Sequence, residues 1–381
     1  MAKVSVAWAN LMHERTRLVV AIAGVAFAVV LIFMNLGFMG ALIATATNFY
    51  QQFNAELFLI SPETLEISTS TAFPRERLYQ VAGVEGVKRV MPLYSEYLLW
   101  RNPETGVSRA IFVYGINPND PVFLMPELQG ENARRILSRP DTVFIDRFSR
   151  PEFGPQAVGT TTEADRRRAT IGGTYALGGG FAADGTLIMS DQNFVRYLEP
   201  RPLNLINVGL VQITPGVSPE KVAQTMRSLL PADVDIYTKA DIIDHDSTYW
   251  LESTSIGFIF SMGVAVSFVV GAVIVYQILF TDIRDHLPEY ATMKAMGYRS
   301  QYLFKIVLQE AILLAMLGYI PGLAAALGLY RLTTTATAGT LPVAMNGGRV
   351  IFVLALTLLM CCLSGLISVR KAVTADPAEI F

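Results

Sequence analysis

The 381-residue chain is 52% hydrophobic and only 16% charged, and its mean hydropathy is +0.41. Soluble globular domains carry about 25% charged residues, so this composition argues against an ordinary soluble protein and points to a bilayer. The net charge of -2 gives no sign of a nucleic-acid partner. The adjacent cysteines Cys361 and Cys362 lie in an apolar run, and there are three histidines, so we expect no disulfide, metal site or cofactor.

Four long, nearly charge-free apolar runs divide the chain. Each holds about twenty apolar residues, enough to cross about 30 Å of hydrocarbon as a helix. The first run is longer than the roughly 7–15 residues of a signal-peptide core, which favours a retained helix over cleavage near Ala44. The predicted organisation is a cytoplasmic interfacial segment at 1–17, a transmembrane helix and stalk at 18–47, a periplasmic domain at 48–251, a second transmembrane helix at 252–281, a cytoplasmic segment at 282–304, a third helix at 305–331, a short periplasmic loop at 332–348, a fourth helix at 349–369 and a cytoplasmic tail at 370–381.

Basic residues near the span ends predict the orientation. They gather in the first 17 residues, between the second and third runs, and just after the fourth run. Cytoplasmic loops carry the excess of lysine and arginine, so we expect both termini in the cytoplasm of a multi-pass inner (plasma) membrane protein.

The segment 48–251 has the pattern of a mixed α/β domain. We expect strands at 55–60, 86–99, 108–115, 206–213 and 234–237. A helix is expected at 73–81 from Pro74, and another at 219–230 capped by Ser218. This β-α-β order at both ends predicts a split ferredoxin-like unit with an insertion at about 117–204.

Three polar groups in this domain have a functional and a structural interpretation. The arginines at 166–168 could bind an anion, but a solvated loop is favoured. The glycines at 178–180 lack the setting of a phosphate loop and indicate a turn. Asp244, His245 and Asp246 could form a metal or acid–base cluster, but consecutive helical residues do not share a face, so a hydrated surface is favoured.

The cytoplasmic segment after the second run contains a short amphipathic helix. Its expected span is 289–296, with Tyr290, Met293 and Lys294 on one face and Gly297 at the C-terminal cap. Such a helix could lie on the lipid headgroups or dock in a groove of a cytoplasmic partner.

This segment resembles the motif of FtsX/MacB-type ABC permeases. The resemblance rests on Glu289, Ala291, Met293, Lys294, Ala295, Met296, Gly297 and Tyr298. The one-plus-three layout, the tail from Arg370 and the start of the third span at Gln309 and Glu310 are also similar to that family. Within it, the stretches 7–11, 17–18, 178–187 and 190–194 most resemble the DevC group of cyanobacterial exporters.

The resemblance implies a four-helix (1+3) membrane protein with a MacB-like periplasmic domain, acting as the non-catalytic permease of an ATP-driven exporter. It implies a homodimer with a separate ABC ATPase, which contacts Glu289, Met293, Lys294 and Gly297 and whose motion the permease transmits. The DevC group further implies a membrane-fusion adaptor, a TolC-like outer-membrane channel and a glycolipid cargo. A lipoprotein-release permease and an FtsX-like regulator of a cell-wall hydrolase remain alternatives, and a membrane-bound enzyme is least favoured. The chain contains no GxxxxGK[ST] motif, so we expect it to hydrolyse no ATP by that mechanism.

Two features of the third span have open interpretations. Glu310, at its edge, is expected to pair with Arg299 or Lys305, although a part in coupling is the alternative. Gly318, Gly322 and Gly328 could allow close helix packing, but glycine is frequent in membrane helices in any case.

Overall fold

The structure is a computed structural model that describes residues 15–178, 183–288, 292, 296, 300–337 and 341–373. It divides into two compact units. One combines Met1–Ala41 with Ser255–Phe381, and we refer to it as the membrane bundle. The other is Leu42–Thr254, which we refer to as the α/β domain.

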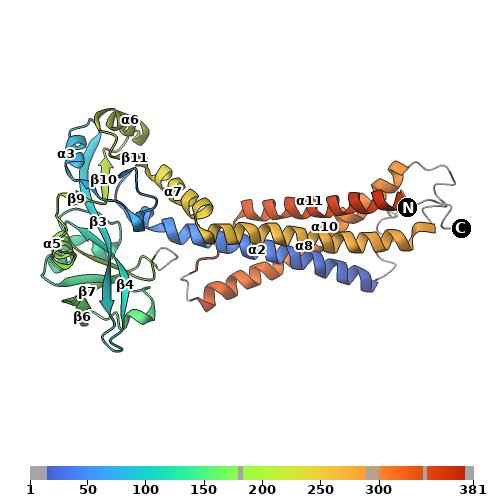
Figure 1. Ribbon diagram of the computed structural model, residues 1–381, viewed down its shortest axis with the longest axis horizontal. Coiled ribbons are helices and arrows are strands. Elements are labelled where there is room, and N and C mark those ends of the chain that lie inside the picture. Colours follow the sequence, from blue (N-terminus) through green and yellow to red (C-terminus); the bar gives the residue numbers. More distant parts are fainter. Residues whose placement is uncertain are drawn as a thin grey trace. The chain divides into compact units, whose positions relative to one another are not determined.

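Four helices of the described chain are long and apolar enough to cross a membrane (Figure 1). They are α2 Arg15–Gln52, α8 Ser255–Asp285, α10 Ser300–Ala336 and α11 Gly347–Val373. The expected set of four membrane helices is therefore confirmed. Each extends beyond the apolar run from which it was predicted, because polar residues at the helix ends continue the same backbone hydrogen-bonding pattern.

Small residues allow the helices of the membrane bundle to pack closely. A Cβ atom placed on Gly318 of α10 would lie 2.5 Å from the side chain of Val25 in α2, and one on Gly322 would lie 2.8 Å from Val29. A Cβ atom placed on Gly328 would meet nothing within 4 Å. Helix association in lipid depends on such close approach, so Gly318 and Gly322 serve packing against α2 whereas Gly328 does not.

Polar side chains also join the helices of the bundle. Ser364 of α11 donates to the carbonyl oxygen of Ala272 in α8 at 2.8 Å, and the Tyr330 hydroxyl of α10 donates to the carbonyl of Phe33 in α2. An ion pair of 2.8 Å joins Arg17 of α2 to Asp285 of α8. These bonds satisfy polar groups within the protein, as a hydrocarbon surrounding requires.

The α/β domain contains a nine-stranded sheet, a separate two-stranded sheet of β2 and β9, and short helices. Its strands are β1 Leu57–Ile60, β2 Phe73–Pro74, β3 Val87–Arg101, β4 Ser108–Ile116, β5 Thr142–Asp146, β6 Thr161–Ala164, β7 Arg167–Tyr175, β8 Thr186–Ser190, β9 Leu205–Ile206, β10 Val208–Ile213 and β11 Asp235–Thr238. Its helices are η1 Ile67–Thr69, α3 Glu76–Ala82, η2 Pro126–Leu128, α4 Gly130–Leu137, η3 Pro151–Phe153, α5 Asp191–Tyr197, α6 Pro219–Leu229, α7 Lys239–Thr248 and the π-helical turn η4 Tyr249–Ser253.

The first four strands of the sheet form the expected split ferredoxin-like unit. Their spatial order is β11-β1-β10-β3, and every neighbouring pair is antiparallel. Helix α3 precedes β3 and helix α6 precedes β11, so a β-α-β unit stands at each end of the domain sequence. The sequence-based fold class is confirmed.

The segment between the two β-α-β units extends the same sheet. The strand order continues β3-β4-β8-β5-β7-β6, and β6 returns to β3 through the pair Trp100 and Ala164. Six strands therefore form a closed ring that shares the long strand β3 with the ferredoxin-like unit. Closure of this kind leaves fewer unpaired strand edges.

The helix expected at 73–81 begins later than predicted. Phe73 and Pro74 pair with β9, and the amide of Arg75 donates to Asn204 at 2.7 Å, so the helix starts at Glu76. Pro74 was expected to lie in the first helical turn, but its backbone pairs with β9 instead. The Ser218 cap is confirmed, since its hydroxyl accepts from the amide of Lys221.

Two apolar layers lie in the α/β domain. One includes residues of α3, α5 and α6 together with the interior of the strand ring. The other includes the last turns of α2, the helix α7 and the strands they cover. The last residues of α2 and the helix α7 are therefore integral parts of this domain's core.

Candidate functional site

The four residues expected to contact an ATPase, Glu289, Met293, Lys294 and Gly297, lie outside the described residues. Two residues of that segment, Thr292 and Met296, are described and exposed. The amide of Met296 donates to the carbonyl of Thr292 at 3.0 Å, an i to i+4 bond of the kind that a helix makes. The role of the segment therefore stays a prediction.

Glu310 lies inside α10, not at an exposed helix edge. Its side chain is fully buried, with a relative exposure of 0%. Lys305 is exposed and makes no ion pair among the described residues, so the expected Glu310–Lys305 pair is not formed. Arg299, the other expected partner, lies outside the described residues. A buried carboxyl in a membrane segment is costly and so tends to mark a functional position.

The C-terminal end of α2 packs in an aromatic cluster of the α/β domain. The rings of Tyr50 and Phe58 meet edge to face at 5.4 Å between centroids, and those of Phe53 and Phe123 stack at 5.1 Å. Backbone bonds add to the packing, because the amide of Leu124 donates to Gln52 at 2.8 Å. This end of α2 is held by stacked rings and by strand-like backbone bonds together.

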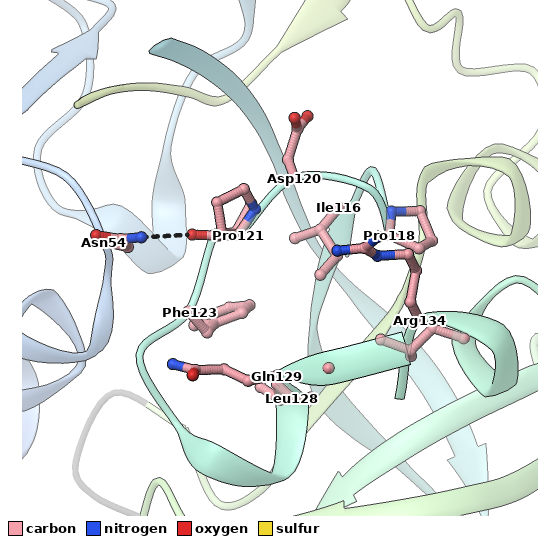
Figure 2. A pocket seen from close by; sticks show the side chains of 12 residues that line it. Asn54, Ile116, Pro118, Asp120, Pro121, Phe123, Leu128, Gln129 and Arg134 are labelled. Atoms are coloured by element: carbon pink, nitrogen blue, oxygen red, sulfur yellow. Dashed lines mark hydrogen bonds between the residues drawn. The ribbon is translucent and has the colours of Figure 1, made fainter. Parts of the chain in front are cut away.

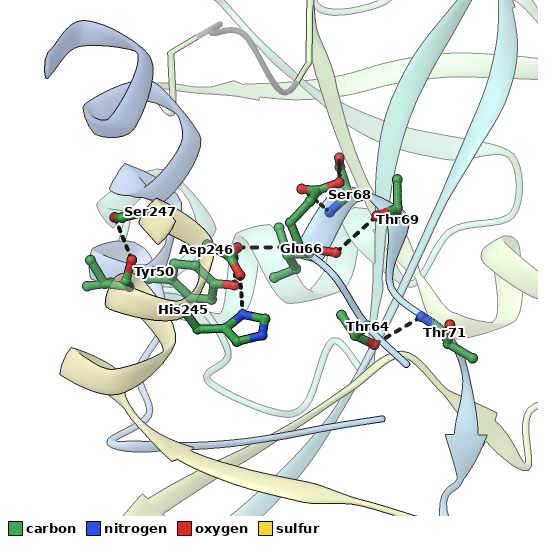
Figure 3. A network of polar contacts seen from close by, with 11 residues as sticks. Tyr50, Thr64, Glu66, Ser68, Thr69, Thr71, His245, Asp246 and Ser247 are labelled. Carbon is green, nitrogen blue, oxygen red and sulfur yellow. Dashed lines mark hydrogen bonds and ion pairs between the residues drawn. The ribbon is translucent and has the colours of Figure 1, made fainter. Parts of the chain in front are cut away.

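A buried carboxylate joins α2, α7 and the turn η1 (Figure 3). Asp246 of α7 is 1% exposed, and its Oδ2 accepts from the Tyr50 hydroxyl at 2.7 Å and from the amide of Ile67 at 3.4 Å. Its Oδ1 lies 3.1 Å from Nδ1 of His245. The expectation that Asp246 belongs to a hydrated surface is wrong, because α7 turns this carboxylate toward α2 while Asp244 remains exposed.

A second bond joins α7 to the end of α2. The ammonium of Lys239, the first residue of α7, donates to the carbonyl of Phe53 at 2.9 Å. A cation is favoured beside the unsatisfied carbonyls at a helix C-terminus. We call Tyr50, Phe53, Ile67, Lys239 and Asp246 the α2–α7 joint.

Burial and hydrogen bonding change the acidity of two groups at the joint. The hydrogen bond to Asp246 raises the pKa of His245, and partial burial of the imidazole opposes that rise. Burial lowers the pKa of Lys239, and the nearby Glu56 carboxylate opposes the change. The protonated imidazole of His245 is thus the form that its carboxylate neighbour favours.

The turn η1 connects the joint to the sheet. Glu66 caps this turn, because its Oε2 accepts from the amide of Ser68 at 2.9 Å. The hydroxyl of Ser70 lies 3.0 Å from that of Ser95 on β3. Asn207, between β9 and β10, donates to the carbonyl of Ser70 at 2.9 Å. The amide of Ser70 also donates to the carbonyl of Ile67 at 3.3 Å, so a continuous path of hydrogen bonds runs from Asp246 through Ile67 and Ser70 to Ser95 of β3.

A small cavity lies beside the end of α2 (Figure 2). Its volume is about 260 Å³ and its lining includes Asn54, Asp120, Phe123 and Arg134. Asn54 donates to the carbonyl of Pro121 at 3.1 Å, which holds one wall of the cavity to the chain that follows α2. Pockets for drug-sized ligands measure roughly 300–1,000 Å³, so this cavity suits a small group and not a glycolipid.

The remaining polar candidates are structural. Asp165 and Arg166 form the turn between β6 and β7, with φ of 45° and 65°. Arg167 pairs with Glu199 at 3.0 Å, and Arg168 is exposed. Within the described ranges, no group of three or more His, Cys, Asp or Glu side chains could hold a metal ion.

Asp146, a buried carboxylate that the sequence did not single out, anchors the start of the glycine-rich loop. Its oxygens accept from the amides of Leu177 at 3.1 Å and Gly178 at 2.8 Å. Burial raises its pKa, and these backbone bonds oppose the rise. Gly178 has φ of 98°, as the predicted turn requires, while Gly179 and Gly180 lie outside the described residues.

The four membrane helices and the mixed α/β domain make this chain a multi-pass membrane protein. Residues 18–229, more than half of the chain, match the MacB-like periplasmic core domain, and residues 261–377 match the FtsX-like permease C-terminal family. The chain therefore belongs to the FtsX/MacB-type ABC transporter permeases and is an inner-membrane protein. Permeases of this family are typically non-catalytic and act with an ABC ATPase.

Three solved structures are similar to about half of this chain at low identity. The periplasmic region of MacB from Actinobacillus actinomycetemcomitans is 12% identical, with 52% of this chain and 94% of that chain covered and a TM-score of 0.37. The extracellular domain of the noncanonic ABC-type transporter YknZ from Gram-positive bacteria is 15% identical, with 49% and 100% covered and a TM-score of 0.35. A domain of a putative permease protein from Porphyromonas gingivalis is 15% identical, with 48% and 86% covered and a TM-score of 0.30. No curated protein sequence matches the chain.

Proposed function

We propose that this chain is the permease subunit of an ATP-driven exporter, working as a homodimer with two copies of a separate ABC ATPase. The observation that carries the proposal is that both family modules occur in order, the MacB-like core at 18–229 and the FtsX-like permease region at 261–377. We place both termini in the cytoplasm, because the segments that follow the second and fourth spans are basic.

The residues of the bundle support transmission of movement more than conduction through a pore. Several charged side chains in the described parts of the spans lie near helix ends, such as Arg17 and Asp285. The buried Glu310 of α10 is an exception in a bundle core formed mainly by apolar side chains. A conduction path for a polar or ionic cargo would line the interior with polar groups. In our proposal ATP hydrolysis instead moves the segment 282–304, and the helices pass this movement to the α/β domain.

We assign ATPase contact to Glu289, Met293, Lys294 and Gly297. The test is Met293→Asp, which places a charge on the proposed docking face. Permease-stimulated ATP hydrolysis should fall to the basal rate of the ATPase, while the amount of permease inserted in the membrane stays normal. Thr292→Asp is the matched control, because neighbouring helical positions point in different directions. Undiminished stimulation by Met293→Asp would remove the coupling assignment.

The cargo and the further partners follow from the DevC resemblance. We propose a periplasmic membrane-fusion adaptor, a TolC-like outer-membrane channel and an envelope glycolipid as cargo. Copurification of the intact permease separates this from its alternatives. An adaptor and channel in the complex support export, a soluble lipoprotein carrier supports lipoprotein release, and a cell-wall hydrolase bound to the α/β domain supports an FtsX-like regulator.

A further inference from the structure

The end of α2 and the helix α7 are attached to each other at two points. Phe53 accepts from Lys239 at 2.9 Å, and Tyr50 donates to Asp246 at 2.7 Å. The two α7 residues are seven positions apart, which is about 10 Å along a helix axis. A single bond would leave α7 free to pivot, whereas two bonds at this separation resist both pivoting and sliding along α2.

These two helices are the segments through which the chain enters and leaves the α/β domain. Helix α2 is continuous from Arg15 to Gln52, and α7 is followed by the turn η4 and then by α8. Any displacement of the spans that reaches the domain along the backbone must pass through α2 or through α7. The α2–α7 joint lies where both routes meet inside the domain.

Asp246 also connects this pair of helices to the sheet. Its Oδ2 accepts from the Ile67 amide as well as from Tyr50, so one oxygen atom serves α2, α7 and η1. From η1 the path continues through Ser70 to Ser95 on β3. Apolar packing around the joint is not directional, but hydrogen bonds to a charged group depend on geometry and are among the stronger ones in proteins.

We propose that Tyr50, Lys239 and Asp246 are positioning residues of the transport cycle. They make the end of α2 and α7 move as one body, and Asp246 passes that movement to the segment 66–70 and so to the centre of the sheet. This inference rests on the proposed function, because it assumes that nucleotide at an ABC ATPase moves the spans.

The test uses the full chain in lipid nanodiscs with its ABC ATPase, and it compares amide hydrogen exchange without nucleotide and with ATP plus vanadate. The Ile67 amide is a direct reporter, since it donates to Asp246. In the wild type we expect nucleotide to change the exchange of 42–54, 239–248 and 64–71. In Tyr50→Phe the nucleotide-dependent change at 64–71 should fall by about half or more, because one of the three partners of Asp246 is lost.

Tyr175→Phe is the matched control. Its hydroxyl is also buried and lies 2.7 Å from the Thr186 hydroxyl, so it bonds β7 to β8 and not to α2 or α7. Each of the two variants loses one buried tyrosine hydroxyl, and the melting temperature should fall in both, by more in Tyr50→Phe because its hydroxyl bonds a carboxylate. Only Tyr50→Phe should change the nucleotide response at 64–71.

Lys239 provides an independent variant for the second attachment. Lys239→Met removes the donor and keeps the aliphatic stem, so the responses of 42–54 and 239–248 should become unequal. Lys239→Arg restores a donor and should restore equal responses. Wild-type responses in Tyr50→Phe and Lys239→Met would overturn the inference and leave the proposed function standing. A wild type with no nucleotide response anywhere would overturn both.

Discussion

The membrane bundle and the α/β domain are stabilised by different interactions, although they belong to one chain. In the bundle, large apolar side chains such as Phe258 and Ile259 face outward, and close contacts at Gly318 and Gly322 hold the helices together. In the α/β domain, large aromatic side chains fill the interior. Burial of apolar surface from water is available only to the second region, so the first depends on tight packing and on bonds between helices.

The largest expected change in stability follows from a substitution in the core of the α/β domain. Trp100 of β3 is 1% exposed, and its indole donates to the carbonyl of Phe153 in η3 at 3.1 Å. Trp100→Ala should lower the free energy of unfolding of this domain by about 3–5 kcal/mol, because a large cavity replaces the ring. Chemical unfolding of the full chain in detergent, followed by proteolysis of the α/β domain, measures this change.

Leu99→Ala, one position along β3, serves as the control for Trp100→Ala. Its side chain is 54% exposed, so the substitution should change the stability by no more than about 0.5 kcal/mol. Equal destabilisation by the two variants would show that the buried and exposed faces of β3 contribute equally to the stability of the domain.

A smaller effect is expected from adding volume to the bundle. A side chain on Gly322 would meet Val29 at 2.8 Å and the backbone oxygen of Ala26 at 3.0 Å. Gly322→Leu should therefore destabilise the bundle by about 1–3 kcal/mol through overpacking. At Gly328 in the same helix an added Cβ atom meets nothing within 4 Å, so Gly328→Leu should be nearly neutral. Thermal unfolding of both variants in the same detergent tests whether close packing at α2 stabilises the bundle.

The smallest effect concerns pH and is confined to the α/β domain. The pKa of His245 is raised in the folded state, so its protonated form stabilises the fold. This stabilisation is fully present below the pKa of the unfolded state, which is about 6.5. It disappears as the pH rises through the pKa of the folded state. His245→Gln should lower the melting temperature of the domain at pH 6 and have less effect at pH 9. The opposite dependence would mean that the neutral imidazole is the form bound by Asp246.

The local sequence pattern was sufficient to predict several helices and strands of the α/β domain. Ser218 and the residues after it specify the start of α6, because a capping hydroxyl and Pro219 act on their immediate neighbours. The strands β5 to β8 were not predicted. Gly172 and Gly173 lie within β7, where they leave room for the side chains of Thr142 and Phe144. Glycine in a sequence indicates a turn more often than such close contact between strands.

The sequence by itself determined the number of spans, the α/β character of the domain between the first two and the membership of a permease family. Long apolar runs, strand periodicity and a short motif act locally, and each can be recognised without knowing the fold. Only the tertiary structure decided that β6 closes a ring with β3 and that Asp246 is buried against Tyr50. Those contacts join residues 64 and 196 positions apart, and nothing in either local segment specifies its distant partner.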